Sequence, residues 1–434
     1  MSLAPGSVPR PGRVRAIASA PGFNAFRHRN YRLFWAGQLT SLIGTWMQTV
    51  AQAWLVLQMT NDPFALGLLS VAQFGPVMIL GLFGGVIADS LPKRQTLIAT
   101  QAVQMVLALV LAALVATGTV QVWHILVLAF LLGCANAVDM PTRQSFTVEM
   151  VGREDVANAV AHSSAVFNAA RVVGPAIAGI TIALVGIAPC FFLNGISFLA
   201  VIAGLLLMRD SELYLGVRSA RPKSVGAVFA NLAEGLSYVR RTPIVLLAIA
   251  TVGLSSTFAI NWGVAIPPMA RDVLHTDAVG FGFIMAAAGI GSLLGALYIA
   301  FTGRASVRLL IGGALMLAVL FTIFGLSRSY PLSVVCMFGA GFGMICMAAS
   351  ANTLIQLTVP DQLRGRVMSV YTTVFAGSTP IGGLATGALA SAYGIAFAVV
   401  LGGALSIVVA TGGALYALRN PDAVRVPGTG VAAA

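Results

Sequence analysis

The chain has 434 residues, of which 58% are hydrophobic and only 9% are charged, and its mean hydropathy is +0.92. A water-soluble domain carries about 25% charged residues, so this composition excludes a soluble globular protein and indicates a membrane protein. Lys and Arg residues outnumber Asp and Glu residues, which gives a net charge of +12. In a membrane protein such an excess sets the orientation of the chain in the bilayer and does not indicate binding to nucleic acid.

Residues 1–30 are expected to form a cytoplasmic tail. They contain Arg10, Arg13 and Arg15 but lack the uninterrupted apolar stretch of a signal peptide. The tail is therefore expected to stay on the inner side of the membrane.

Stretches without Asp, Glu, Lys or Arg predict twelve membrane spans. A helix needs about 20 apolar residues to cross a hydrocarbon core of about 30 Å, and six stretches fit one crossing each. Three longer stretches divide at Gly or Pro into two spans each, and the fifth span must reach back past Arg171 to about Val156. The single-span stretches are 33–61, 63–88, 242–270, 278–303, 309–327 and 329–360, and the double ones are 95–138, 172–208 and 367–418.

The basic residues predict the orientation of these spans. If the N-terminus is cytoplasmic, every Lys and Arg falls on the inner side except Arg271 and Arg328, which lie outside, and Arg171, which lies within a span. Cytoplasmic loops of membrane proteins are enriched in Lys and Arg. Both termini are therefore predicted to be cytoplasmic.

The spans fall into two halves of six, separated by a polar segment. Residues 209–241 carry too many charges to cross and are predicted to be a cytoplasmic linker. A shift of 208 residues pairs Gly174, Gly179 and Gly186 with Gly382, Gly387 and Gly394, and such duplication is typical of transporters built from parallel repeats. The predicted fold is an all-α membrane protein in two six-helix bundles. The segments are the tail 1–30, a bundle 31–208, the linker 209–241, a bundle 242–418 and a tail 419–434.

Residues 85–97, GVIADSLPKRQTL, lie between spans two and three and resemble the motif G-x-L-A-D-R-x-G-R-[RK]-x-x-L of the major facilitator superfamily. Gly85 permits close helix contact, Asp89 accepts hydrogen bonds from a facing helix N-terminus, and Lys93 and Arg94 supply cations at the inner surface. Ser and Pro replace the Arg and second Gly of the motif, so the loop is stiffer than the family pattern. The alternative is that Asp89 merely ends a helix and the two cations follow the orientation rule.

Residues 170–179, in span five, resemble the antiporter motif G-x-x-x-G-P-x-x-G-G, with Ala in place of two glycines. Gly174 and Gly179 let a facing helix approach, and Pro175 bends the span. The three residues are therefore expected to help the two halves rock against each other, as the resemblance to an exporter motif implies.

Longer stretches at 44–55, 139–149 and 359–369 resemble the enterobactin-exporter-like branch of the same superfamily, which also includes drug and macrolide efflux proteins. The resemblance implies the major facilitator fold and proton-driven export of a small amphipathic molecule across a bacterial cytoplasmic (inner) membrane. The partners it implies are a small-molecule substrate, protons and the lipid bilayer, and the chain is expected to be a monomer.

Arg171 is the main candidate for the substrate cavity. A span that starts near Val156 puts it about 22 Å along the helix, close to the middle of the bilayer. A charge at that depth normally faces a cavity or a partner, so Arg171 either serves substrate or coupling or has a structural role in an ion pair or a clamp on backbone carbonyls. Uncharged polar and aromatic residues either line the same cavity or hold helices together. They are Trp46, Gln48, Gln52, Asn168 and Asn261.

Span one has no acidic residue, so protons must use an acid nearer the inner side. The choices are Asp89, Asp139 and Glu149, and Asp139 is preferred because partial withdrawal from water favours proton uptake. It is expected near the cytoplasmic edge of span four, where Arg143 lies one helical turn away. Asp139, Arg143 and Glu149 are thus the predicted coupling residues.

The sequence lacks the motifs that other classes of membrane protein require. There is no GxxxxGK[ST] loop for ATP, no HExxH, no paired intramembrane carboxylates and no Ser/His arrangement. The four cysteines lack CxxC spacing, so no metal or other cofactor is expected. The chain is therefore predicted not to be an enzyme, and the remaining alternative is a lipid flippase on the same fold.

Overall fold

A computed structural model describes residues 22–214, 225–302, 305–421 and 423, with only the backbone described at 81–90 and 225–230. These residues form helices and turns, with no strand among them. The N-terminal half contains η1 (Asn24–Arg27), α2 (Arg29–Thr60), α3 (Pro63–Ser90), α4 (Lys93–Ala116), α5 (Val122–Val185), α6 (Ala188–Leu206) and η2 (Asp210–Glu212). The C-terminal half contains α7 (Val225–Arg241), α8 (Pro243–Ala259), α9 (Trp262–Pro268), η3 (Met269–Val273), α10 (Ala278–Thr302), α11 (Val307–Leu326), α12 (Tyr330–Thr358), α13 (Asp361–Tyr393) and α14 (Ile395–Arg419).

The helices account for twelve spans. In the described part of the chain, nine helical segments are long and apolar enough to cross a membrane, and α8, α9 and η3 together count as one of them. One of the nine, α5, consists of two spans joined at Gly152, where the backbone leaves the helical region, so the nine segments hold ten spans. The two remaining spans are α2 and α13, which carry more polar side chains. The twelve-span prediction is confirmed.

The region between spans four and five differs from the expectation. Instead of ending near residue 138, the helix of span four continues to Val151 and turns at Gly152, which has φ 74° and ψ 175°. Glycine adopts this conformation at little steric cost, so a single residue reverses the chain. Three further helical turns follow Asp139 before this bend, and its side chain is fully buried.

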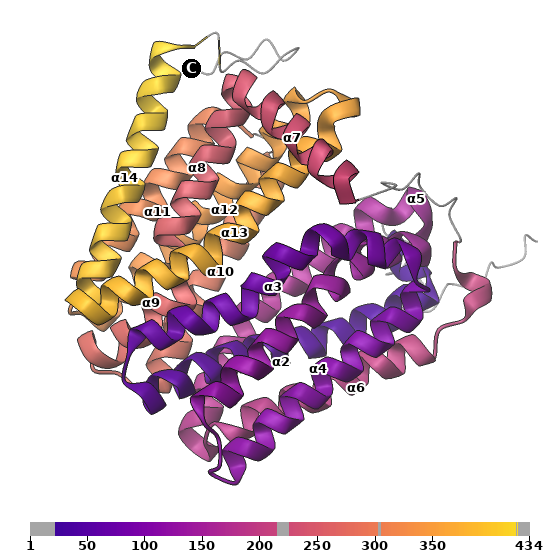
Figure 1. Ribbon diagram of the computed structural model, residues 1–434, viewed down its shortest axis with the longest axis horizontal. Helices are drawn as coiled ribbons and strands as arrows, with labels where there is room; N and C mark the ends of the chain where they lie inside the picture. The colour runs from indigo at the N-terminus through magenta and orange to yellow at the C-terminus, as the bar shows by residue number, and fades with distance from the viewer. Residues whose placement is uncertain (1–21, 215–224, 303–304, 422, 424–434) are drawn as a thin grey trace, which may run out of the picture.

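The two bundles meet at the end where α9 lies and diverge toward α7 (Figure 1). Two helix pairs make most of the contact, α3 with α13 and α5 with α10, and α9 also packs against α2 and α3. Small residues line both: a Cβ on Gly387 would lie 2.8 Å from the Pro63 carbonyl oxygen, and one on Gly179 would lie 2.6 Å from that of Ala278. Because helix backbones touch at these points, one end of the molecule is closed.

The paired glycines of the sequence repeat occupy equivalent places in the two halves. Gly179 and Gly387 each face a helix of the opposite bundle, whereas Gly174 and Gly382 each face the first helix of their own bundle, α2 and α8. Gly186 and Gly394 both end their helices with positive φ, 92° and 87°. This geometry supports a duplicated origin of the two halves.

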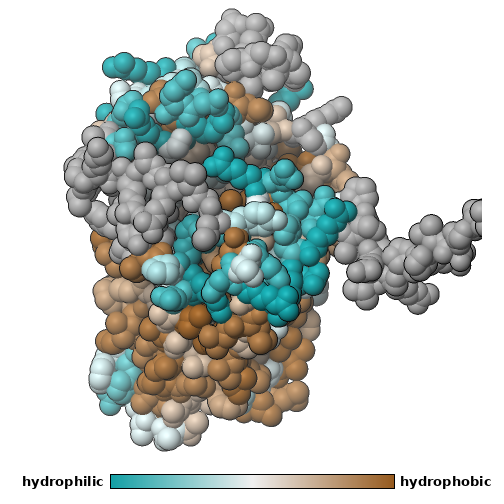
Figure 2. Space-filling view, turned by 90° about the vertical axis from the view of Figure 1, so that its right-hand side faces the viewer, coloured by the Kyte–Doolittle hydropathy of each residue, from teal (hydrophilic) through white to brown (hydrophobic). Residues whose placement is uncertain are grey.

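The outer surface of the molecule has the polarity that a bilayer requires. Figure 2 shows a band of hydrophobic side chains across the lower part of one face, and hydrophilic side chains gathered above it, toward the end at which the C-terminus lies in Figure 1. The hydrophobic band is the part expected to contact lipid.

Parts of the expected tail and linker are folded onto the bundles. Residues 22–28 pack on α5, where the Ala25 amide donates to Asn158 Oδ1 (2.9 Å) and His28 Nε2 lies 2.9 Å from Asp155 Oδ2. In the linker, α7 docks on α13 through an ion pair of Arg366 with Glu234. Residues 1–21, 215–224 and 424–434 of the predicted tails and linker lie outside the described residues.

Candidate substrate and coupling sites

Arg171 lies on α5 where the two bundles come together. Its guanidinium carbon is 5.8 Å from the ring centroid of Trp46 on α2 and 5.3 Å from that of Trp262 on α9. Its Nη2 lies 3.8 Å from Sδ of Met344 on α12. The side chain therefore contacts residues of both bundles.

The charge of Arg171 has no acidic partner among the described residues, so the alternative of a structural ion pair is not supported. Each cation–π contact stabilises the guanidinium by about 0.5–2 kcal/mol, whereas withdrawing a charge from water costs several kcal/mol. The indoles and the thioether thus offset only part of that cost. The arrangement is suited to receive an electron-rich or negatively charged group.

Trp262 and Met344 are site residues that the sequence did not reveal. Trp262 is only 4% exposed, so its indole belongs to the interior of the molecule. The reason is that the seventh span breaks between α8 and α9, and this break turns the indole toward the centre of the molecule. Met344 lies in a glycine-rich apolar helix and carries no sequence signal for a site.

The predicted polar lining residues divide into two groups. Gln48 accepts a hydrogen bond from Asn194 Nδ2 (2.7 Å), and Gln52 accepts one from Gln73 Nε2 (3.2 Å). Both glutamines are buried within the N-terminal bundle, where they hold α2 to α6 and to α3, and their assignment to the substrate cavity stays a prediction.

Asn168 lies near Arg171, whereas Asn261 lies next to Trp262 in sequence and its side chain faces α13. Asn168 is one helical turn before Arg171 on α5 and donates to the Ser164 carbonyl oxygen (2.9 Å). Asn261 immediately precedes Trp262 at the break in the seventh span; its Nδ2 donates to the Thr257 carbonyl oxygen (2.6 Å). Its Oδ1 is buried and has no hydrogen-bond partner, so it remains free to accept one.

Asp139 is the centre of a buried polar cluster inside the N-terminal bundle. It pairs with Arg143, as the spacing predicted, and its Oδ1 accepts hydrogen bonds from Thr100 Oγ1 (2.8 Å) and Gln101 Nε2 (2.9 Å). Arg143 also donates to Gln38 of α2. The cluster joins α2, α4 and α5, and every partner of the carboxylate is a donor.

The predicted inner-surface cations act within the N-terminal bundle. Lys93 Nζ lies 2.6 Å from Glu149 Oε1. Glu149, a predicted coupling residue, is therefore ion-paired with Lys93, a predicted residue of the conformational switch. Arg94 donates to the Leu205 carbonyl oxygen (2.8 Å) and pairs with Asp210 (2.6 Å), which ties α4 to the end of α6. Gly85 and Asp89 fall in the stretch of α3 whose side chains lie outside the described residues.

The glycine–proline motif of the fifth span has two faces. A Cβ on Gly174 would lie 2.5 Å from Cβ of Trp46, so this residue lets α5 approach α2 inside one bundle. On the other face, Gly179 and Pro175 contact α10 of the opposite bundle, and a Cβ on Gly282 would lie 2.4 Å from the Pro175 carbonyl oxygen. The motif therefore serves both bundle packing and closure between the bundles.

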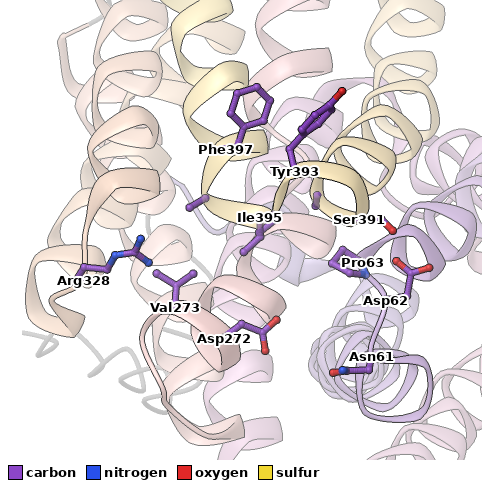
Figure 3. A pocket seen from close by; sticks show the side chains of 13 residues that line it. Asn61, Asp62, Pro63, Asp272, Val273, Arg328, Ser391, Tyr393, Ile395 and Phe397 are labelled. Carbon is purple, nitrogen blue, oxygen red and sulfur yellow. The ribbon is translucent and has the colours of Figure 1, made fainter.

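A separate cavity of about 540 Å³ lies at the closed end, between loops of both bundles (Figure 3). The N-terminal bundle contributes Asp62, and the C-terminal bundle contributes Asp272 and Arg328. Nearby, Arg271 pairs with Asp272 (2.5 Å) and donates to the Leu57 carbonyl oxygen (3.0 Å), which links the two bundles. No sequence pattern had indicated this cavity.

The family model described as transmembrane secretion effector matches residues 20–428, nearly the whole chain. The chain belongs to this family of major facilitator transporters. The multidrug efflux pump Tap of Mycolicibacterium fortuitum is 30% identical, with 82% of this chain and 88% of that protein covered. The staphyloferrin A transporter of Staphylococcus aureus is 24% identical (84% and 90% covered), and the macrolide efflux protein A of Streptococcus pyogenes is 22% identical (88% and 96% covered).

Solved structures support the same fold for this major facilitator transporter. A bacterial homologue of the human lysosomal transporter Spinster, in an inward-facing and unoccupied conformation, aligns with a TM-score of 0.67 at 14% identity, with 92% of this chain and 97% of that chain covered. The family and these relatives are transporters and not enzymes, so the prediction of a non-enzymatic efflux-type membrane protein is confirmed.

Proposed function

We propose that the transporter exports a small amphipathic molecule, siderophore-like or drug-like, in exchange for protons. The names of its relatives support this proposal, since they describe efflux of drugs and macrolides and transport of a siderophore. These relatives come from bacteria, so we place the protein in the cytoplasmic (inner) membrane of a bacterium. We further propose that it acts as a monomer.

The orientation follows from the distribution of basic residues, which favours cytoplasmic termini. With that orientation, the closed end faces the exterior and the structure represents an inward-facing state. The bundles 31–208 and 242–418 then rock against each other, and the linker 209–241 keeps them together. Release of the α3–α13 and α5–α10 contacts opens the outer end in this scheme.

The cargo site proposed here is centred on Arg171. The observation that carries it is the position of one unbalanced guanidinium between Trp46 and Trp262, which belong to opposite bundles. A cation flanked by two indole faces matches an amphipathic molecule with an acidic group and an apolar or aromatic body. Asn168, one helical turn before Arg171, supplies a polar contact beside it, and the free Oδ1 of Asn261 is a further acceptor at the break before Trp262.

Proton coupling is assigned to Asp139, with Arg143 and Glu149 as its supporting charges. A buried carboxylate held by donors changes protonation when those donors move, and α2, α4 and α5 all contribute to its surroundings. The conformational switch is assigned to Gly85, Asp89, Lys93 and Arg94 at the inner side and to Gly174, Pro175 and Gly179 within the fifth span.

Efflux from cells that lack other pumps tests this proposal. The cells are loaded with a dye, a macrolide or a carboxylate siderophore. Loss of each compound from the cells is followed with the proton gradient intact and again after an uncoupler is added. Export that stops with the uncoupler and with Arg171→Ala supports the proposal. Movement of fluorescent lipid in liposomes, without loss of any of these compounds from cells, would instead establish the flippase alternative.

A further inference from the structure

A groove of about 570 Å³ runs between α2 and α6 on the N-terminal bundle, at the end where α2 begins. Arg29 and Arg32 lie at its mouth, and Ala36, Gly37, Ala203 and Gly204 are among the residues along it. This groove takes no part in the proposed cargo or coupling sites.

The small residues create the groove. Gly37 and Gly204 bring the helices into backbone contact: a Cβ on Gly37 would lie 2.8 Å from the Ala200 carbonyl oxygen, and one on Gly204 would lie 2.9 Å from that of Leu33. Beside this contact line, the exposed residues Ala36 and Ala203 carry only methyl groups. The two helices therefore leave an apolar furrow instead of a ridge of side chains.

The two arginines hold their positive charges at the mouth of this furrow. Arg29 Nη1 donates to the Leu207 carbonyl oxygen (2.8 Å), and Arg32 Nη1 donates to that of Phe26 (2.8 Å). Neither arginine has a carboxylate partner in the described part of the chain, and no Asp or Glu lines the groove. A guanidinium has five N–H donors, so each arginine keeps donors for an anion after binding its carbonyl oxygen.

We infer that this groove binds an anionic phospholipid, with the phosphate between Arg29 and Arg32 and one acyl chain along the furrow. The groove starts on a membrane-spanning helix and opens beside α6, so its apolar part matches a lipid chain. Its charge matches an anionic head group, and basic pockets between spans at the cytoplasmic side are known to bind such head groups. A zwitterionic phospholipid also has a phosphate, but its ammonium group is repelled by the two arginines, so it gains less attraction.

Binding to the purified full-length protein tests this inference. Native mass spectrometry in detergent compares a phosphatidylglycerol with a phosphatidylcholine of the same acyl chains. Each arginine is expected to contribute about fivefold, so the anionic lipid should bind about 25-fold more tightly. The double variant Arg29→Gln/Arg32→Gln should remove this preference, while Arg308→Gln, an exposed arginine at the start of α11 in the other bundle, should leave it intact.

A second variant keeps both arginines, because Arg29 also binds the end of α6 and its loss can weaken the fold. Ala203→Leu fills the furrow from the lipid-facing side and should weaken binding of the anionic lipid several-fold while the protein stays folded. Equal affinity for the two lipids in the wild type would overturn the inference. So would a preference that survives the double variant, or one that Arg308→Gln removes equally.

Discussion

Arg171 and Trp262 belong to opposite bundles, yet the guanidinium carbon of Arg171 lies 5.3 Å from the centre of the Trp262 indole. A contact of this kind exists only while the bundles are in this relative position. Any ligand that binds Arg171 therefore competes with, or adds to, a contact between the two bundles. In the proposed function, this relationship links cargo binding at Arg171 directly to the movement of the bundles.

The first prediction concerns this arginine. Arg171→Ala should reduce export about tenfold or more, because the only cation beside the two indoles is lost and tenfold corresponds to about 1.4 kcal/mol of binding. The amount of folded protein in the membrane should stay close to wild type, since no ion pair is broken. Arg328→Ala, which removes an exposed arginine from the outer cavity, is the matched control. Unimpaired export by Arg171→Ala at equal protein levels contradicts the cargo role.

The second prediction concerns closure of the outer end. Gly282→Ala places a Cβ 2.4 Å from the Pro175 carbonyl oxygen, so α5 and α10 must separate. A destabilisation of about 1.4 kcal/mol would change the ratio of closed to open states about tenfold. Spin labels at Asp62 and Arg328, which face the outer cavity from opposite bundles (Figure 3), should report longer distances in this variant.

Gly312→Ala is the control for that experiment, because a Cβ at Gly312 meets nothing within 4 Å. Its distance distribution should equal that of the unsubstituted protein. An unchanged distribution in Gly282→Ala would show that the α5–α10 contact does not hold the outer end closed.

The third prediction concerns proton coupling. Asp139→Asn should abolish cargo-driven proton movement in liposomes, because the amide cannot take up a proton. The same change leaves Arg143 without its acidic partner, and breaking a buried ion pair from one side costs about 3–5 kcal/mol. Asp139→Asn/Arg143→Gln removes both charges, so it should fold better than the single variant and still be uncoupled. Full proton movement in either folded variant would make the assignment wrong.

The fourth prediction concerns stability. Gly152→Ala should lower the free energy of unfolding by about 1–3 kcal/mol, because a residue with a side chain is strained at φ 74° and ψ 175°. Gly365→Ala is the control, since Gly365 lies in the regular helix α13 and a Cβ there meets nothing. Thermal unfolding followed by tryptophan fluorescence should separate the two variants. Equal midpoints would contradict the strain argument.

The sequence alone determined the number of spans and the presence of two halves. Within a bilayer, each helix must satisfy its own backbone hydrogen bonds, so a span is a property of one continuous stretch and is visible in its charges. The pair of Asp139 and Arg143 was also predictable, because residues four apart on one helix lie side by side.

The tertiary structure alone decided which residues of different spans meet. Trp262 contacts Arg171 because the seventh span breaks just before Trp262. Gln48 and Gln52 form hydrogen bonds with neighbouring helices of their own bundle. Both outcomes depend on the rotation of each helix about its axis and on the partners that pack against it. In membrane spans, the pattern of hydrophobic residues does not set that rotation, since lipid-facing and protein-facing sides are both apolar.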